Sequence, residues 1–345
     1  MNDIDRSIAT RTAADLPRWP AEFEPHACCW MVWPVRPTWG DKLDLVEREF
    51  ADVAHAIAQF EPVKMIAAPD TAARARRLLA AGIEVIELPI SDSWFRDSGP
   101  SFVKTPQGQL AGLCWRFNGW GGANPYFADD AHLARRLLAD LGIEAQTSAL
   151  ALEGGAIFSD GEGTLLTTDS VVFNPNRNPG LTRAHAEAEF RRALGIEKVI
   201  WLPGNAHEFG TNGHIDGIAT FVRPGVVLFE TASEESGPAF EATRANLQAL
   251  EGQTDAKGRK LEVMFIREAE RGRDGHGDWG YSSSYVNFFI ANGGIVMPAF
   301  GLPGDAPARA AVAAAFPDRL IAQVNIANIA AGGGGIHCIT QQQPL

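Results

Sequence analysis

The feature that most constrains this 345-residue chain is a pattern that recurs along it. A polar residue precedes a short apolar stretch, a glycine-containing turn and a second apolar stretch, which is typical of a β-hairpin. The units open at intervals of roughly 50 to 75 residues, and such spacing indicates an internal repeat. The opening polar residues are Asp97, Glu153, His214, Asn287 and Cys338. A radial or stacked repeat would bring these side chains together at its centre, whereas ordinary α/β alternation would give the spacing by chance.

Helical and extended segments alternate between these units. Helical spacing of apolar residues predicts helices over 43–60, 71–81, 132–141, 183–194 and 238–250. Runs of apolar residues bounded by glycine and proline predict strands over 27–33, 63–67, 83–88, 110–117, 164–168, 226–229 and 295–297. Strand–helix–strand order along most of the chain predicts an α/β fold.

Composition excludes several classes of protein. Hydrophobic residues make up 46% and charged residues 21%, as in a soluble globular protein. No run of eighteen apolar residues is present, so we expect no membrane-spanning helix. The net charge of -12 disfavours nucleic acid and anionic membranes as partners and suits a cationic small molecule. The polar N-terminus and four cysteines without a CxxC pair predict a cytoplasmic protein with free thiols.

The polar residues of the repeat indicate a particular chemistry. Cys338 follows a run of four glycines, which presents the thiol on a loop. His214 and Asp216 are two residues apart and would share one face of a strand. Carboxylates crowded together need a cation among them, and a planar guanidinium pairs with carboxylates through parallel hydrogen bonds. The set therefore predicts a site in which carboxylates hold a guanidinium and a thiolate attacks its central carbon.

The expected mechanism is covalent. Cys338 adds to the guanidinium carbon, His214 protonates the departing nitrogen, and ammonia leaves. His214 then deprotonates a water molecule, which displaces Cys338 and leaves a urea. A metal site is the alternative, but His337 and Cys338 would face opposite sides of a strand, and neither HExxH nor paired CxxC is present. We therefore expect no metal.

The chain resembles the agmatine deiminase family of the guanidino-group-modifying (pentein) superfamily. The resemblance runs from near residue 19 to the C-terminus, and its segments include Trp94–Pro100, Phe117–Gly122, Leu152–Gly155, Asn176–Pro179, Thr211–Asp216, Ser284–Phe288 and Gly333–Pro344. It implies a five-bladed α/β propeller of ββαβ modules in a single catalytic domain over residues 1–345, with residues 1–15 flexible. It also implies hydrolysis of agmatine to N-carbamoylputrescine and ammonia, a step toward putrescine in polyamine biosynthesis.

The resemblance assigns roles to residues of this sequence. It implies Cys338 as nucleophile, His214 as acid and base, Asp97 and Asp216 as ligands of the guanidinium, and Glu153 as support for His214 or the substrate. Family members commonly form homodimers and need no cofactor. Trp94 is expected to stack on the substrate or to pack in the core, and Asn287 to contact the substrate.

Some positions depart from the family pattern. Gly217 and Gly335 stand where the family usually has asparagine, and the segment Gly272–Ser283 is also unlike the usual one. Arg116 is a solvent-facing residue or, alternatively, a reader of a substrate carboxylate. The substrate is therefore left open among agmatine, free or peptidyl arginine and other guanidinoalkylamines. A binding protein without activity is a further alternative, which retention of the cysteine, histidine and carboxylates disfavours.

Overall fold

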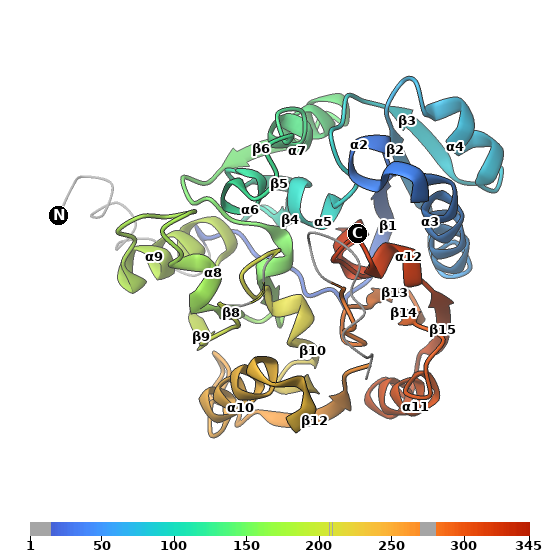
Figure 1. Ribbon diagram of the computed structural model, residues 1–345. Helices are drawn as coiled ribbons and strands as arrows, with labels where there is room; N and C mark the ends of the chain where they lie inside the picture. Colours follow the sequence, from blue (N-terminus) through green and yellow to red (C-terminus); the bar gives the residue numbers. More distant parts are fainter. Residues whose placement is uncertain (1–14, 207, 209, 270–280) are drawn as a thin grey trace.

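The computed structural model describes residues 15–206, 208, 210–269 and 281–345 (Figure 1). Five β-sheets with helices between their strands make this part of the chain a mixed α/β fold, which confirms the predicted class. The expectation of flexibility for residues 1–15 falls, except for Asp15, outside the described residues, as does most of the atypical Gly272–Ser283 segment. No helix in the described ranges is long and apolar enough to cross a membrane.

The first sheet unites both ends of the described chain. Its strands lie in the order β16-β1-β2-β3, so the C-terminal strand pairs with the first one. Their bounds are β16 Thr340–Pro344, β1 His26–Val32, β2 Val63–Ala67 and β3 Glu84–Glu87. The associated helices are α2 Arg36–Trp39, η2 Gly40–Lys42 (a 3-10 helix), α3 Leu43–Ile57 and α4 Ala72–Leu78.

The second and third sheets follow in chain order. The second consists of β4 Ser101–Lys104, β5 Leu110–Cys114 and β6 Glu144–Thr147, with helices α5 Phe95–Ser98, α6 Gly119–Gly122 and α7 Asp130–Asp140. The third consists of β7 Ile157–Ser159, β8 Thr164–Thr168 and β9 Lys198–Leu202, with helices η3 Gly154–Ala156, α8 Asp169–Val172 and α9 Arg183–Leu194.

The fourth and fifth sheets complete the set. The fourth consists of β10 Ala219–Arg223, β11 Val226–Thr231 and β12 Glu262–Arg267, with helices η4 Ile215–Gly217, η5 Glu234–Ser236 and α10 Pro238–Leu250. The fifth consists of β13 Phe289–Ala291, β14 Gly294–Ala299 and β15 Leu320–Asn325, with α11 Asp305–Ala315 and α12 Ala327–Ala330. The 3-10 helix η6 His337–Ile339 then leads into β16.

All five sheets share one connection pattern. An antiparallel pair of strands is followed by a long helix and a third strand parallel to its neighbour, as in β10, β11, α10 and β12. In the first sheet the antiparallel partner is β16. Tight hairpin turns need residues with positive φ, which glycine adopts without steric cost. Gly108, Gly225 and Gly293, all with φ of 78° or 75°, occupy such turns.

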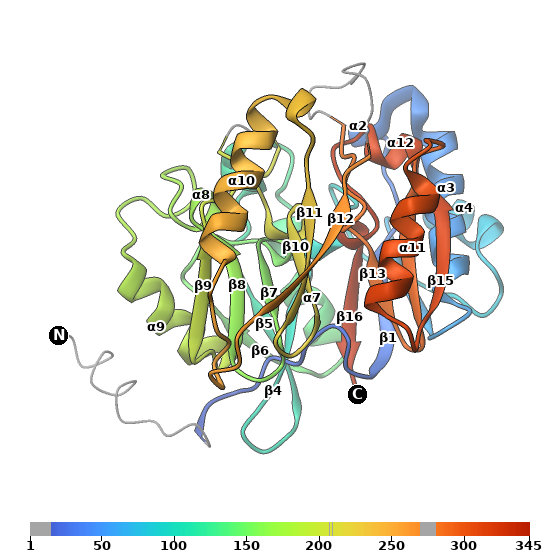
Figure 2. The same cartoon turned by 90° about the horizontal axis from the view of Figure 1, so that it is seen from below.

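The helices that connect the sheets lie on the outside of the molecule. Figure 1 shows α3, α7, α9, α10 and α11 around the periphery, with the first strands of the sheets nearer the centre. In the perpendicular view of Figure 2 the strands of neighbouring sheets run roughly along one direction. The apolar core is divided among the sheets. One buried cluster joins Phe158 and Leu166 of the third sheet to Phe221 and Phe229 of the fourth.

The turns that precede the first strands contact one another. The helix α5 contacts η3 and η6, and η3 contacts η4. These short helices come from different sheets and carry or adjoin the polar residues that open the repeat units. The repeat in the sequence therefore corresponds to five sheets whose opening turns carry the polar residues and contact one another, the fifth through hydrogen bonds of Asn287.

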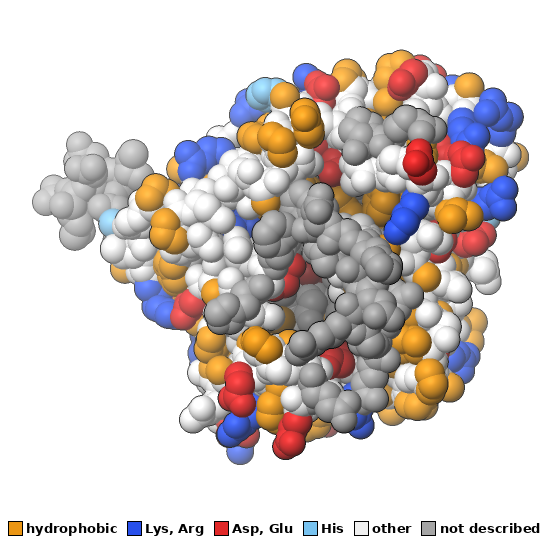
Figure 3. Space-filling model, in the orientation of Figure 1, with side chains coloured by type: hydrophobic (Ala, Val, Ile, Leu, Met, Phe, Trp, Pro, Cys, Tyr) orange, Lys and Arg blue, Asp and Glu red, His pale blue; other side chains and the backbone are white. Residues whose placement is uncertain are grey.

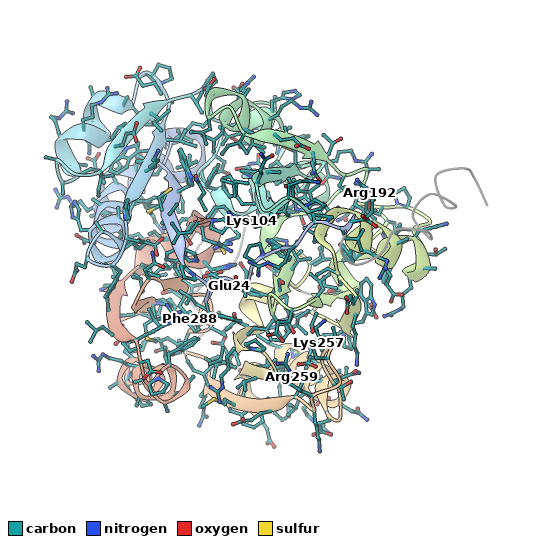
Figure 4. The ribbon with its side chains drawn as sticks, turned by 180° about the vertical axis from the view of Figure 1, so that it is seen from behind. Glu24, Lys104, Arg192, Lys257, Arg259 and Phe288 are labelled. Atoms are coloured by element: carbon teal, nitrogen blue, oxygen red, sulfur yellow. The ribbon has the colours of Figure 1, made fainter. Side chains whose placement is uncertain are left out.

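The face opposite the one in Figure 1 carries paired surface charges. Figure 4 labels Lys257 and Arg259 on this side. Lys257 Nζ lies 3.4 Å from Glu197 Oε2, and Arg259 pairs with Glu162 and Asp255. The pairs with Glu197 and Glu162 are exposed on both sides and contribute little net stability, whereas the Asp255 side chain is buried. None of these five residues lines a cavity that contains Cys338.

Candidate active site

The five expected catalytic residues come together at the opening turns. Asp97 lies in α5, Glu153 directly precedes η3, His214 and Asp216 flank the start of η4, and Cys338 lies in η6. Two strand assignments in the sequence analysis were wrong. His214–Asp216 and His337–Cys338 both lie in 3-10 turns immediately before a strand, so strand alternation does not set their directions.

Cys338 differs from the other cysteines in its exposure. Its side chain is partly exposed, whereas Cys28, Cys29 and Cys114 are buried. Its Sγ lies 3.6 Å from Asp216 Oδ2 and 3.3 Å from Asn287 Nδ2. Burial of the sulfur and the carboxylates of Asp216 and Asp97 raise the pKa of the Cys338 thiol well above its usual range. Without a cation beside it, this cysteine is therefore a protonated thiol.

His214 is held by a buried ion pair that sequence reasoning missed. Its Nε2 lies 3.1 Å from Glu153 Oε2, and Arg177 Nε donates to both oxygens of Glu153 at 2.9 Å. Burial alone would raise the pKa of Glu153, but Arg177 and His214 lower it. Burial would lower the pKa of His214, but Asp97, Glu153 and Asp216 raise it to about 9. His214 is therefore an imidazolium at neutral pH.

Asp97 is oriented by two donors. Trp120 Nε1 donates to Oδ2 at 2.9 Å, and the backbone N–H of Gly155 donates to Oδ1 at 2.9 Å. Burial raises the pKa of Asp97 from its ordinary value, and the neighbouring carboxylates add to this rise. Gly155 is needed here because a Cβ would lie 2.7 Å from His214 Nδ1 and 2.8 Å from Asp216 Oδ2.

Asp216 is held by a second buried chain of charges. His337 Nδ1 lies 2.8 Å from Asp216 Oδ2, and His337 Nε2 lies 2.9 Å from Glu22 Oε2. Arg96 Nη2 lies 3.5 Å from the same Glu22 oxygen. Burial would raise the pKa of Asp216, but the hydrogen bond and charge of His337 lower it. Asp216 is therefore a carboxylate, whose second oxygen is not used by His337.

Two cavities meet at Cys338. We call the first the acidic chamber; it measures about 300 Å³, and its lining includes His214, Asp216, Gly217, Glu230, Glu268, Asn287 and Cys338. We call the second the aromatic chamber; it measures about 570 Å³, and its lining includes Trp39, Lys42, Asp92, Trp94, Asp97, Trp120 and Cys338. Figure 3 shows acidic side chains in red at the centre of this face.

The remaining predicted binding residues are placed as follows. Trp94 lines the aromatic chamber and packs against Trp39, with ring centroids 5.4 Å apart. Asn287 contacts Cys338 and donates from Nδ2 to the carbonyl of Asp216 at 3.2 Å. Arg116 is exposed, lines neither chamber and donates to the carbonyl of Arg177 at 3.2 Å. The structure thus gives no support for Arg116 as a reader of a substrate carboxylate.

The two atypical glycines have different surroundings. A Cβ at Gly335 would lie 2.4 Å from Asn287 Oδ1, so Asn287 occupies the space that a side chain would need. A Cβ at Gly217 would meet no atom within 4 Å. Within the described residues, no group of three or more histidine, cysteine, aspartate or glutamate side chains is arranged to hold a metal ion.

Known proteins share this architecture and sequence. The profile of the Porphyromonas-type peptidyl-arginine deiminase family matches residues 18–344. The agmatine deiminase of Pseudomonas aeruginosa is 42% identical over 96% of each chain. That of Ectopseudomonas mendocina is 40% identical over 98% of each chain. The solved agmatine deiminase of Enterococcus faecalis superposes with a TM-score of 0.92 at 35% identity, covering 96% of this chain and 97% of its own.

These matches extend over nearly the whole chain, and the resemblance predicted from its motifs is thereby confirmed. The chain belongs to the agmatine deiminases within the Porphyromonas-type peptidyl-arginine deiminase family.

Proposed function

We propose that this protein hydrolyses the guanidino group of agmatine to N-carbamoylputrescine and ammonia through a covalent intermediate on Cys338. The observation that carries the proposal is the placement of a partly exposed thiol beside Asp216, in cavities that also contain His214 and Asp97. Agmatine deiminases among its relatives at 40% identity or more support agmatine as the substrate.

Binding of the guanidinium is assigned to Asp97 and Asp216. Trp120 and Gly155 orient the first carboxylate, and His337 orients the second. Two fixed carboxylates match the N–H donors of a planar guanidinium and set its plane relative to Sγ of Cys338. The bound cation also offsets the negative field that keeps the thiol protonated, so substrate binding lowers the pKa of Cys338 and its proton passes to solvent water, since His214 is already protonated.

The chemical steps then follow in order. The thiolate forms a C–S bond to the guanidinium carbon, and the C=N electron pair moves to nitrogen. His214, a cation at neutral pH, donates its proton to the departing nitrogen, and ammonia leaves as the C–N bond breaks. The product is an amidino group bound through sulfur to Cys338.

Hydrolysis reverses the role of His214. The neutral imidazole takes a proton from water, whose oxygen adds to the amidino carbon. The C–S bond breaks, Cys338 is released, and the urea group of the product remains. Arg177 holds Glu153 in place, and Glu153 orients the imidazole and favours its protonated form between cycles. Each step uses a side chain already present, and we propose that no cofactor or metal takes part.

We infer that the five sheets form a five-bladed propeller of ββαβ modules within one catalytic domain over residues 1–345. Support comes from the shared sheet order and from the contacts among α5, η3, η4 and η6. The placement of Cys338 and Asp97 on turns from different sheets follows from this arrangement. A cytoplasmic homodimer is proposed from the family resemblance and from the free thiols.

The test is ammonia release by the purified protein from agmatine, arginine, a capped arginine peptide and 4-guanidinobutyrate. We expect agmatine to have the highest kcat/KM. A carboxylate-bearing compound with a higher value would retain the chemistry and remove agmatine as the substrate. Binding of agmatine without ammonia release would instead identify a binding protein.

A further inference from the structure

The two chambers that meet at Cys338 differ in charge. The acidic chamber is lined by Glu208, Glu230 and Glu268 in addition to Asp216, and no lysine or arginine is among its described lining residues. The aromatic chamber contains Lys42 together with the carboxyl groups of Asp92 and Asp97, so its lining is of mixed charge. A cationic group beyond the guanidinium is therefore favoured in the acidic chamber and disfavoured near Lys42.

Glu230 is the unusual member of this lining. It lies near the end of β11, is 8% exposed, and its Oε2 accepts the backbone N–H of Val286 at 3.0 Å. The buried Glu22 and Glu153 each face an arginine, at 3.5 and 2.9 Å. Glu230 forms no salt bridge with any described residue, and burial raises its pKa to about 8. Without a cation beside it Glu230 is therefore mostly protonated at neutral pH, and an incoming cation would favour its carboxylate form.

Glu230 is connected to the reacting thiol. It binds the backbone of Val286, and the next residue, Asn287, donates to Cys338 Sγ at 3.3 Å. Open space adjoins Gly217, directly after Asp216, where an added Cβ would meet no atom within 4 Å. The chamber therefore extends from the guanidinium position at Asp216 toward Glu230 without a side chain at residue 217 to fill it.

We propose that Glu230, with Glu268 in the same chamber wall, binds the distal ammonium group of an aminoalkylguanidine whose guanidinium lies at Cys338. This specificity role rests on the proposed function and names the substrate class that the site selects. The ammonium would supply the cationic partner that Glu230 does not have among the described residues. A carboxylate at the same end of the substrate, as in arginine, would be repelled by the acidic lining.

The experiment compares agmatine with 1-pentylguanidine, in which a methyl group replaces the distal ammonium. Both are assayed with the wild-type protein, Glu230→Gln and the matched control Glu61→Gln. Glu61 is also a buried carboxylate that accepts a backbone N–H, from Asn292 at 2.8 Å, but it lines neither chamber. Glutamine keeps the acceptor oxygen for Val286 and cannot acquire the negative charge that a bound ammonium would favour on Glu230.

We expect Glu230→Gln to raise KM for agmatine by about 10- to 100-fold, the range for a lost charge-assisted hydrogen bond. The KM of Glu230→Gln for pentylguanidine should stay within about twofold of wild type. The KM of Glu61→Gln should do so for both compounds. An equal loss of kcat on both guanidines would indicate that Glu230 only supports the loop of Val286, and would overturn the proposal.

The remaining results separate failure of the ammonium site from failure of the proposed function. If Glu230→Gln does not fold, Glu268→Gln is assayed, and an unchanged ratio of the agmatine and pentylguanidine values overturns the proposal. If the wild-type protein hydrolyses both compounds with equal kcat/KM, the ammonium site is wrong while guanidine hydrolysis stands. If the wild type hydrolyses neither, the proposed function itself has failed.

Discussion

Nε2 of His214 lies 3.1 Å from Oε2 of Glu153, and Arg177 Nε donates to both oxygens of the same carboxylate. The Glu153 carboxylate therefore stays fixed beside His214, because both residues are buried and Glu153 also forms an ion pair with Arg177. The proton on His214 is therefore a consequence of the folded structure and is available for the departing nitrogen.

The raised pKa of His214 makes stability depend on pH. Folding raises the pKa from about 6.5 to about 9, so the folded protein binds this proton more tightly than the unfolded chain does. The resulting stabilisation is fully present below about pH 6.5 and is lost as pH rises through about 9. Wild type should lose more unfolding free energy over this range than His214→Gln, by on the order of 3 kcal/mol.

Urea unfolding at pH 6.5, 7.5, 8.5 and 9.5 measures this difference. If the free energy of unfolding changed with pH by the same amount in wild type and in His214→Gln, the raised pKa of His214 would be contradicted. If the stability difference between wild type and His214→Gln became smaller as pH falls, the upward direction of the His214 pKa shift would be contradicted.

Removal of the thiol separates chemistry from binding. Cys338→Ala keeps Asp97 and Asp216, the proposed ligands of the guanidinium, but removes the proposed nucleophile. We expect turnover to fall below detection while agmatine binding, measured by calorimetry, remains within about tenfold of wild type. Cys114→Ala is the matched control, because Cys114 is buried and lines neither chamber. Turnover near the wild-type rate in Cys338→Ala would exclude covalent catalysis by this residue.

The two proposed guanidinium ligands, Asp97 and Asp216, should affect binding and rate together. Asp97→Asn and Asp216→Asn each replace an acceptor oxygen by an amide N–H that faces the donors of the substrate. We expect kcat/KM to fall by about 100-fold or more in either variant, with KM raised as well. Asp255→Asn serves as the control, since Asp255 pairs with Arg259 and lines neither chamber. An increase in KM without loss of kcat would show that the residue binds the substrate and the transition state equally and does not promote the chemical step.

A substitution at Gly155 tests whether activity depends on the close packing of His214, Asp97 and Asp216 around this residue. Gly155→Ala would place a methyl carbon 2.7 Å from His214 Nδ1 and 3.0 Å from Asp97 Oδ1, which separates the acid from the substrate position. We expect at least about 100-fold lower kcat, because small displacements of catalytic groups are costly. Gly82→Ala meets no atom within 4 Å and should retain activity. Equal activity of these two variants would show that the tight contact at residue 155 has no functional consequence.

Much of the fold follows from local sequence signals. Helices α9 and α10 have the predicted bounds, because each has helical apolar spacing and a clear start at Thr182 or Pro238. The predicted helix over 43–60 ends at Ile57, three residues early, where the chain turns toward Pro62. The predicted opening residues of the repeat all precede the first strand of a sheet. The number of residues between them is therefore the length of one sheet with its connecting helix.

The supporting residues of the site could not be found in this way. Arg177 and Glu153 are 24 residues apart, Trp120 and Asp97 are 23 apart, and His337 and Glu22 are 315 apart. Each pair is formed by packing between turns or sheets, which leaves no periodic signal in the sequence. The assignment of His214 and Asp216 to a strand was wrong for a related reason: a short polar turn before a strand has the same local composition as the strand end.

The central claim is that Cys338 forms a covalent bond to the guanidinium carbon, and mass spectrometry of acid-quenched reactions tests it most directly. Wild-type protein mixed with agmatine and quenched during steady state is digested, and the peptide that contains Cys338 is analysed. We predict an agmatine-derived amidino adduct on Cys338 that disappears when substrate is exhausted. Full turnover with this peptide unmodified, or an adduct on another residue, would contradict the mechanism.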